Sequence, residues 1–142
     1  MREQTFEQRI VQCVSAMNQA AWRIGGRGAD RLKLSDIAPW VAGQVEAGHG
    51  EVVCPYCGVV LDSMTTAFDH VVPLSRDGTN TLDNLAMVCR RCNWYKASMT
   101  GAEWSRLVDA LRAAGQLDRF FALYRPWPRR IEVFEGLATH EE

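Results

Sequence analysis

Apolar side chains recur at every third or fourth position along residues 5–24. This spacing puts them on one face of a helix, so the segment is predicted to form an amphipathic α-helix. The sequence GGRG at residues 25–28 is predicted to end it, because glycine readily adopts the left-handed backbone conformation of a helix terminus. We expect the apolar face of this helix to contribute to the hydrophobic core.

Two further helices are predicted from capping residues and periodicity. One runs from Asp36 to about Glu46, with Ser35 as its N-terminal cap. The other begins at Thr100, which forms with Glu103 the T-x-x-E pattern of a capping box. A short helix and a proline-broken tail are expected after it.

The middle of the chain has a different pattern. EVVCPYCGVVL at residues 51–61 predicts two short strands around a tight turn, and TTAFDHVVPLS at residues 65–75 predicts a strand. RDGTNTLDN at residues 76–84 is rich in turn formers, and residues 85–99 are expected to become helical around the second cysteine pair. Strands between helices predict an α+β fold.

Composition bounds the class of protein. The chain has 142 residues, of which 47% are hydrophobic and 23% charged, which fits one globular domain with its own core. It contains no apolar run long enough to span a membrane, and its N-terminal residues are polar, so we expect a soluble, cytoplasmic protein. The net charge of −1 argues against tight non-specific binding to nucleic acid. Any DNA affinity must then come from a local patch, a metal ion or a few arginines.

Four cysteines form two C-x2-C pairs separated by 31 residues: Cys54, Cys57, Cys89 and Cys92. Two such pairs can complete a closed tetrahedral site, and four sulfur ligands favour zinc. Structural zinc contributes roughly 10–16 kcal/mol in small peptides, which is comparable to the stability of a whole domain. We predict a structural zinc ion, with an iron–sulfur cluster or disulfides as alternatives. The fifth cysteine, Cys13, is expected to pack as a small hydrophobic residue.

Polar residues that suit phosphodiester hydrolysis lie between and just after these pairs. They are Asp69, His70, Asn84, Asn93 and Lys96. Hydrolysis needs a base for water, a metal ion near the phosphate, and a scaffold that aligns them. Histidine suits the base, and aspartate and asparagine supply the oxygen ligands that magnesium prefers. Each residue alone also fits an ordinary structural role, such as a turn, a cap or a solvated charge.

The joint pattern resembles the HNH endonuclease family. The resemblance is carried by CPYCG, FDHVVPLSRDGTNTLDNL and CRRCNWYK within residues 54–96, about a third of the chain. It implies a ββα-metal core with a four-cysteine zinc knuckle, flanked here by N- and C-terminal helices. It also implies a metal-dependent DNA endonuclease or nickase that leaves 5′-phosphate and 3′-hydroxyl ends.

The resemblance assigns a role to each residue. His70 matches the general base, Asp69 the acidic metal ligand, and Asn84 the asparagine that ties down the loop and so orients the base. Asn93 stands where many relatives have a final histidine and matches a metal ligand. The loss of that imidazole favours Mg²⁺ or Mn²⁺ as the catalytic ion. Lys96 is expected to contact a phosphate. Asp69→Ala is expected to abolish cleavage while leaving zinc content and melting temperature nearly unchanged.

Further expectations concern DNA contacts and organisation. Arg76, Arg90 and Arg91 are candidates for the DNA backbone. The basic and aromatic tail from Tyr124 to Arg130 could bind a strand or pack on the core.

The chain is expected to form a single HNH nuclease domain, monomeric or homodimeric. It would comprise a helical N-terminal extension (1–50), a zinc-braced core (51–100), and C-terminal helices with a tail (101–142). The alternative function is a non-catalytic zinc-dependent module that binds DNA or docks a protein.

Overall fold

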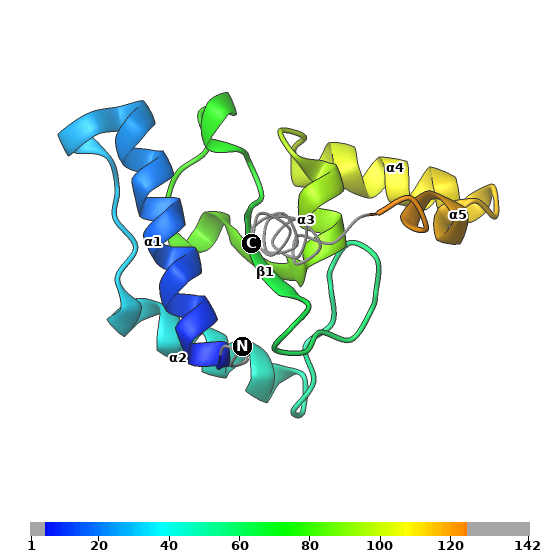
Figure 1. Cartoon of the computed structure of the whole chain (residues 1–142), viewed down its shortest axis with the longest axis horizontal. Helices are drawn as coiled ribbons and strands as arrows, with labels where there is room; N and C mark the ends of the chain where they lie inside the picture. The colour runs from blue at the N-terminus through cyan, green and yellow to red at the C-terminus, as the bar shows by residue number, and fades with distance from the viewer. Residues whose placement is uncertain (1–4, 125–142) are drawn as a thin grey trace, which may run out of the picture.

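A computed structural model describes residues 5–124. Five α-helices and two β-strands are present there, joined by short 3₁₀ turns (Figure 1). This composition confirms the predicted α+β class. In chain order the elements are α1 (Phe6–Gly25), α2 (Leu34–Ala47), β1 (Thr66–His70), β2 (Leu85–Cys89), α3 (Arg90–Lys96), α4 (Gly101–Ala113) and α5 (Leu117–Phe121).

The two strands form an antiparallel sheet at the centre of the molecule. Helices α1 and α2 lie on one side of it, and α3, α4 and α5 lie on the other (Figure 1). The register runs from Thr66 opposite Cys89 to His70 opposite Leu85. Because side chains alternate along a strand, each strand sends residues into both sides.

Each side of the sheet has its own hydrophobic core. Phe68 and its cross-strand partner Met87 pack with residues of α1 and α2. Val88 packs on the other side with Trp104 and Val108 of α4, all three fully buried. A two-stranded sheet is marginal by itself in water, so the helices on both sides stabilise it.

The two helices with the strongest sequence signals form as predicted. Thr5 caps α1 through a capping box with Gln8, and the helix ends where Gly26 has φ 62°. Thr100 and Glu103 form the predicted capping box of α4.

The predicted start of α2 is wrong by two residues. The carbonyl of Lys33 accepts the first helical hydrogen bonds, so Ser35 lies inside the helix and does not cap it. The reason is a tertiary contact just before the helix. The Asn18 amide pairs with the backbone N–H and carbonyl of Leu32 at 2.8 and 3.0 Å, which fixes the chain direction at that point.

The strand boundaries also differ from the predictions. The predicted strand over residues 65–75 ends at His70, after which the chain folds into a loop. Residues 85–99 are not helical throughout, because the first five form β2 and the helix begins at Arg90. Around the first cysteine pair the predicted strands shrink to one bridge between Val53 and Val60. Within residues 5–124, no helix combines the length and the apolar character that crossing a membrane requires.

Candidate functional site

The four cysteines of the two pairs come together in space. Their Sγ atoms all lie within 4.8 Å of one another, and those of Cys57 and Cys89 are 3.6 Å apart. A tetrahedral zinc ion with Zn–S bonds of about 2.3 Å holds its sulfurs roughly 3.8 Å apart. All four cysteines are free thiols, so disulfides are not formed among them. The four side chains are therefore positioned to bind one metal ion.

The thiols compete for protons in this cluster. Hydrogen bonds from the other thiols, Cys54 first, hold the pKa of Cys57 far below its ordinary value. Hydrogen bonds with the same neighbours, again Cys54 first, raise the pKa of Cys92. The pKa of Cys54 is also lowered, to about 6, while that of Cys89 is raised, so the cluster favours two thiolates and resists the other two. A divalent cation would stabilise the fully deprotonated set.

Asp69 lies in β1, and both of its carboxylate oxygens have partners. Lys96 Nζ donates to Oδ1 at 3.1 Å, and the Tyr56 hydroxyl donates to Oδ2 at 3.0 Å. Burial raises the pKa of the Asp69 carboxyl, while the charge of Lys96 and the two hydrogen bonds oppose that rise. Burial and the neighbouring Asp69 also raise the pKa of Tyr56 well above its ordinary value.

Lys96 is turned into the protein rather than toward a phosphate. It is 0% exposed, and besides Asp69 its ammonium donates to the backbone carbonyl of His70 at 2.9 Å. This differs from the expected phosphate contact. The physical reason is that a buried carboxylate needs a counter-charge, and the end of α3 places Lys96 within reach. Lys96 therefore fixes the end of β1 and the residue that follows Asp69.

His70 is held by an asparagine that the sequence analysis did not single out. Its Nε2 lies 2.8 Å from Oδ1 of the buried Asn80. The Asn80 amide nitrogen donates to the backbone carbonyl of Asp30 at 3.1 Å and to Oδ1 of Asn18 at 2.9 Å. A carbonyl oxygen only accepts, so the amide orientation is fixed and Nε2 must be the donor to Asn80. In neutral His70, Nδ1 is then the nitrogen with a free lone pair.

Asn84 ties down the loop between the two strands. Its Oδ1 accepts from the N–H of Val72 at 2.9 Å, and its amide donates to the carbonyls of Val72 and Thr79 at 2.9 and 2.8 Å. Gly78 is needed in this loop, since a Cβ there would lie 1.8 Å from the Val72 oxygen. Asn84 thus shapes the loop, while the direct contact to His70 comes from Asn80.

Asp69, His70 and Asn93 line one open pocket of about 310 Å³. Met17 of α1 and Pro73 of the loop form part of its walls. Asn93, on α3, is half-buried, and its side-chain amide makes no hydrogen bond to any residue in the range 5–124. The structure therefore brings a carboxylate, an imidazole and an available amide together at one opening.

Two of the arginines proposed as DNA contacts have partners in the chain. Arg76 forms an ion pair with Glu103, the capping residue of α4. Arg90 donates to the carbonyl of Met64 at 3.3 Å. Both side chains remain partly accessible, so these contacts do not prevent a phosphate from approaching.

Arg91 belongs to the surroundings of the cysteine cluster. Its guanidinium lies 4.0 Å from the ring centre of Phe121 and 3.7 Å from Sγ of Cys57. A cation near the sulfurs partly offsets the negative charge of thiolates. The tail beyond Tyr124, with its basic and aromatic residues, lies outside the described residues.

Three polar residues at the site were missed by sequence reasoning. Asn18 had a visible signal, because it follows Val14 by one helical turn and so places an amide beside the apolar face of α1. Tyr56 and Asn80 had none, since a tyrosine between two cysteines and an asparagine in a turn are ordinary there. Their roles depend on contacts that only the folded chain creates.

A strand–loop–strand–helix unit carries Asp69 and His70 at the end of its first strand and lies beside a four-cysteine cluster. Residues 54–98 match the family model described as HNH endonuclease, which confirms the resemblance.

Two curated proteins are similar to part of the chain. One is the "CRISPR-associated endonuclease Cas9" of Corynebacterium diphtheriae, 41% identical over 54 residues. The other is the protein of the same name from Actinomyces naeslundii, 39% identical over 54 residues. In both comparisons the matched segment covers 37% of this chain but only 5% of the relative. The similarity therefore concerns one small part of each relative.

Proposed function

We propose that the chain is a metal-dependent DNA endonuclease or nickase. It hydrolyses a phosphodiester bond and leaves 5′-phosphate and 3′-hydroxyl ends. The observation that carries this proposal is the shared pocket of Asp69, His70 and Asn93. The match of residues 54–98 to HNH endonucleases supports it.

His70 is the general base in this proposal. Asn80 holds Nε2–H, so Nδ1 of the neutral ring accepts a proton from the attacking water. Lys96 holds the backbone of His70 through the carbonyl, which limits movement of the ring relative to Asp69. The chain thus fixes both the protonation pattern and the position of the base.

Asp69 and Asn93 would hold the catalytic Mg²⁺ or Mn²⁺. Their oxygens are of the kind these ions prefer, and the Asp69 carboxylate retains lone pairs beyond those used by Lys96 and Tyr56. When bound, such an ion neutralises charge on the phosphate and on the leaving oxygen. The ion pair with Lys96 favours the ionised form of Asp69 and fixes the orientation of its carboxylate despite its burial.

The four-cysteine cluster would hold a structural zinc ion. With four protein ligands the site leaves no open position for a substrate, so its role is to fix the fold. It pins residues on both sides of the Asp-His segment, which lies between the two cysteine pairs. We place the nuclease core at residues 51–100, with residues 1–50 and 101–142 as helical extensions of one domain.

A plasmid assay tests the proposal. Zinc-loaded protein should convert supercoiled DNA to nicked or linear forms when Mg²⁺ is added, and should leave it intact when Mg²⁺ is omitted. His70→Ala should lose about 100- to 10,000-fold in rate. His49→Asn is the matched control, because His49 is exposed and asparagine tolerates its positive φ of 55°.

The alternative is a zinc-dependent module that binds DNA or a protein without catalysis. The inward contacts of Asp69 and Lys96 favour it, since they serve stability without any reaction. Cleavage that is Mg²⁺-dependent and lost in His70→Ala excludes this alternative. DNA products with 3′-phosphate ends would contradict the proposed chemistry.

A further inference from the structure

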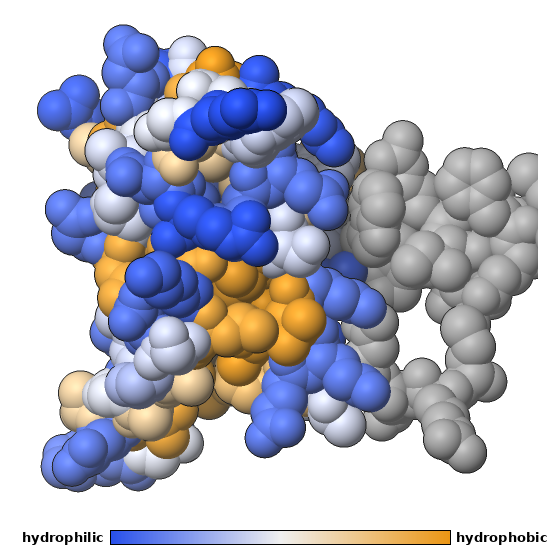
Figure 2. All heavy atoms as spheres, turned by 90° about the vertical axis from the view of Figure 1, so that its left-hand side faces the viewer, coloured by the Kyte–Doolittle hydropathy of each residue, from blue (hydrophilic) through white to orange (hydrophobic). Residues whose placement is uncertain are grey.

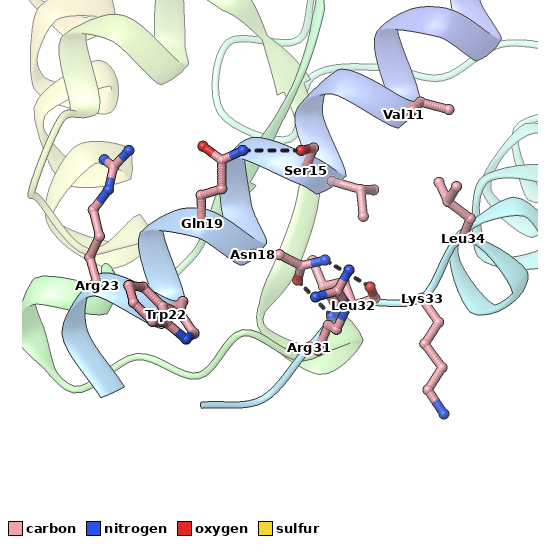
Figure 3. Close-up of a pocket in the computed structure, with 11 residues that line it drawn as sticks. Val11, Ser15, Asn18, Gln19, Trp22, Arg23, Arg31, Leu32, Lys33 and Leu34 are labelled. Atoms are coloured by element: carbon pink, nitrogen blue, oxygen red, sulfur yellow. Dashed lines mark hydrogen bonds between the residues drawn. The ribbon is translucent and has the colours of Figure 1, made fainter. Parts of the chain in front are cut away.

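Helix α1 borders a second and larger hollow, separate from the pocket of His70. This groove has a volume of about 630 Å³ and runs between α1 and the segment that leads into α2. One wall carries residues spaced by a helical turn along α1, among them Val11, Ser15 and Trp22 (Figure 3). The other wall carries Arg31, Lys33 and their neighbours.

The floor of the groove is apolar and its rim is basic. Val14 and Leu32 are buried at its base. On this side of the molecule, hydrophobic residues gather in the middle and hydrophilic residues surround them (Figure 2). The charged residues that line the groove are Arg23, Arg31 and Lys33, and no carboxylate is among its described lining residues. The groove therefore suits an anionic occupant with an apolar part.

The three cations of the rim differ from those near the candidate active site. Arg23, Arg31 and Lys33 are exposed and form no ion pair or side-chain hydrogen bond with any residue from 5 to 124. In contrast, Lys96 is fully buried against Asp69. The chain as a whole carries a net charge of −1, whereas all three charged residues that line the groove are basic.

Trp22 adds a surface for stacking. Its side chain is 62% exposed at the edge of the groove. An exposed indole beside unpaired cations matches the way proteins bind single strands, with bases stacked on aromatic rings and phosphates held by basic side chains. Bases within a duplex have their faces covered by neighbours, so the indole favours an unpaired segment.

We propose that this groove binds a single-stranded segment of nucleic acid, with phosphates on Arg31 and Lys33 and a base on Trp22. This proposal rests in part on the proposed nuclease function, because the bound strand would be an unpaired segment beside the bond that is cleaved. The position supports this, because α1 also lines the pocket of His70 through Met17. Asn18, which lines the groove, bonds to Asn80, the partner of His70.

Binding is measured separately from cleavage. A fluorescein-labelled oligothymidylate is titrated with the zinc-loaded chain of residues 1–142, without added Mg²⁺, and its anisotropy is recorded. Trp22→Ala should weaken binding about 5- to 150-fold, and Trp22→Phe should restore most of it. Ile24→Ala is the matched control, because Ile24 lies in the same helix, is also 62% exposed, and does not line the groove.

The cations are tested through salt dependence. The double variant Arg31→Gln/Lys33→Gln should reduce the slope of log affinity against log salt by about 1.4, which is two phosphate contacts to a single strand. The control Arg106→Gln/Arg119→Gln removes two exposed cations of α4 and α5 and should leave the slope unchanged.

Several results would overturn the proposal. The first two are a wild-type protein that does not bind the oligonucleotide, and groove variants that bind it with the same affinity as the wild type. The other two are a groove that binds an acidic peptide but not the oligonucleotide, and groove variants whose oligomeric state differs from that of the wild type. If the wild-type protein binds the oligonucleotide through Trp22 but does not cleave plasmid DNA, only the nuclease proposal is contradicted. If the wild-type protein cleaves plasmid DNA and the groove variants bind the oligonucleotide as tightly as the wild type, only the proposed strand binding in the groove is contradicted.

Discussion

The Nε2 atom of His70 lies 2.8 Å from Oδ1 of Asn80, and this bond selects the tautomer of the candidate base. Asn80→Ala removes the acceptor, so the ring can rotate or carry its proton on Nδ1. We expect the turnover rate to fall about 10- to 100-fold, the range for residues that orient a functional histidine, with little change in KM.

A spectroscopic measurement separates this effect from a general loss of structure. Long-range ¹⁵N–¹H spectra of the neutral ring should show the proton on Nε2 in the wild type and a mixture of tautomers in Asn80→Ala. Thr79→Ala, an exposed neighbour in the same loop, should behave as wild type. A single Nε2–H tautomer in Asn80→Ala would remove the basis for this role.

The ion pair of Asp69 and Lys96 changes an expectation drawn from the sequence. The sequence predicts a nearly unchanged melting temperature for Asp69→Ala, but this substitution leaves the buried Lys96 ammonium without its partner. We now expect a loss of about 3–5 kcal/mol in the free energy of unfolding. Denaturant unfolding at saturating zinc measures it.

A second variant tests the cause of that loss. Asp69→Ala/Lys96→Met removes the stranded charge along with the carboxylate, so most of the stability should return while cleavage stays absent. If the double variant were as unstable as Asp69→Ala, the ion pair would not explain the loss.

The cysteine cluster should control folding. Cys54→Ser removes one of the four ligands. Because the binding of structural zinc contributes roughly as much free energy as the net stability of a whole domain, we expect the variant to unfold or aggregate. Zinc content and circular dichroism measure this. Cys13→Ser is the control, as Cys13 lies outside the cluster on α1. A soluble Cys54→Ser protein that melts cooperatively without zinc would show that the metal is dispensable.

Tyr56 makes stability sensitive to alkaline pH. Burial and Asp69 raise its pKa in the folded state above the ordinary value near 10. The contribution of Tyr56 to the free energy of unfolding is therefore fully present below about pH 10. It declines as pH rises further, because Tyr56 ionises at a lower pH in the unfolded chain than in the folded protein. The folded proteins are titrated with base and tyrosinate absorbance is recorded. Wild type and Tyr56→Phe should give the same amplitude, because Tyr56 stays protonated while the protein is folded. A smaller amplitude in Tyr56→Phe would show that Tyr56 ionises in the folded protein.

The sequence predicted those parts of the fold that local interactions decide. The apolar period of α1 and the capping box at Thr100 need only residues within a turn of each other, and both formed as predicted. The start of α2 did not, because Asn18 holds Leu32 from another helix.

The same distinction applies to the candidate site. Spacing along the chain predicted that four cysteines would meet, since each pair already forms half of a site. The direction of Lys96 and the partner of His70 depend on which groups are buried together. Burial of Asp69 required a cation, and Asn80 needed acceptors from residues fifty or more positions away. Sequence spacing carries no information about such contacts.

The sheet between two cores implies that the two halves can open at different times. The five residue pairs of β1 and β2 lie between the layer of α1 and α2 and the layer that holds the cysteines. Amide hydrogen exchange should therefore reveal α1 as a separate unit that opens before the cysteine layer. In such a half-open state Asn80 would lose Asn18 while the four thiols stay in place. A sample could then contain its full complement of metal and still hold a fraction of molecules whose base is misaligned.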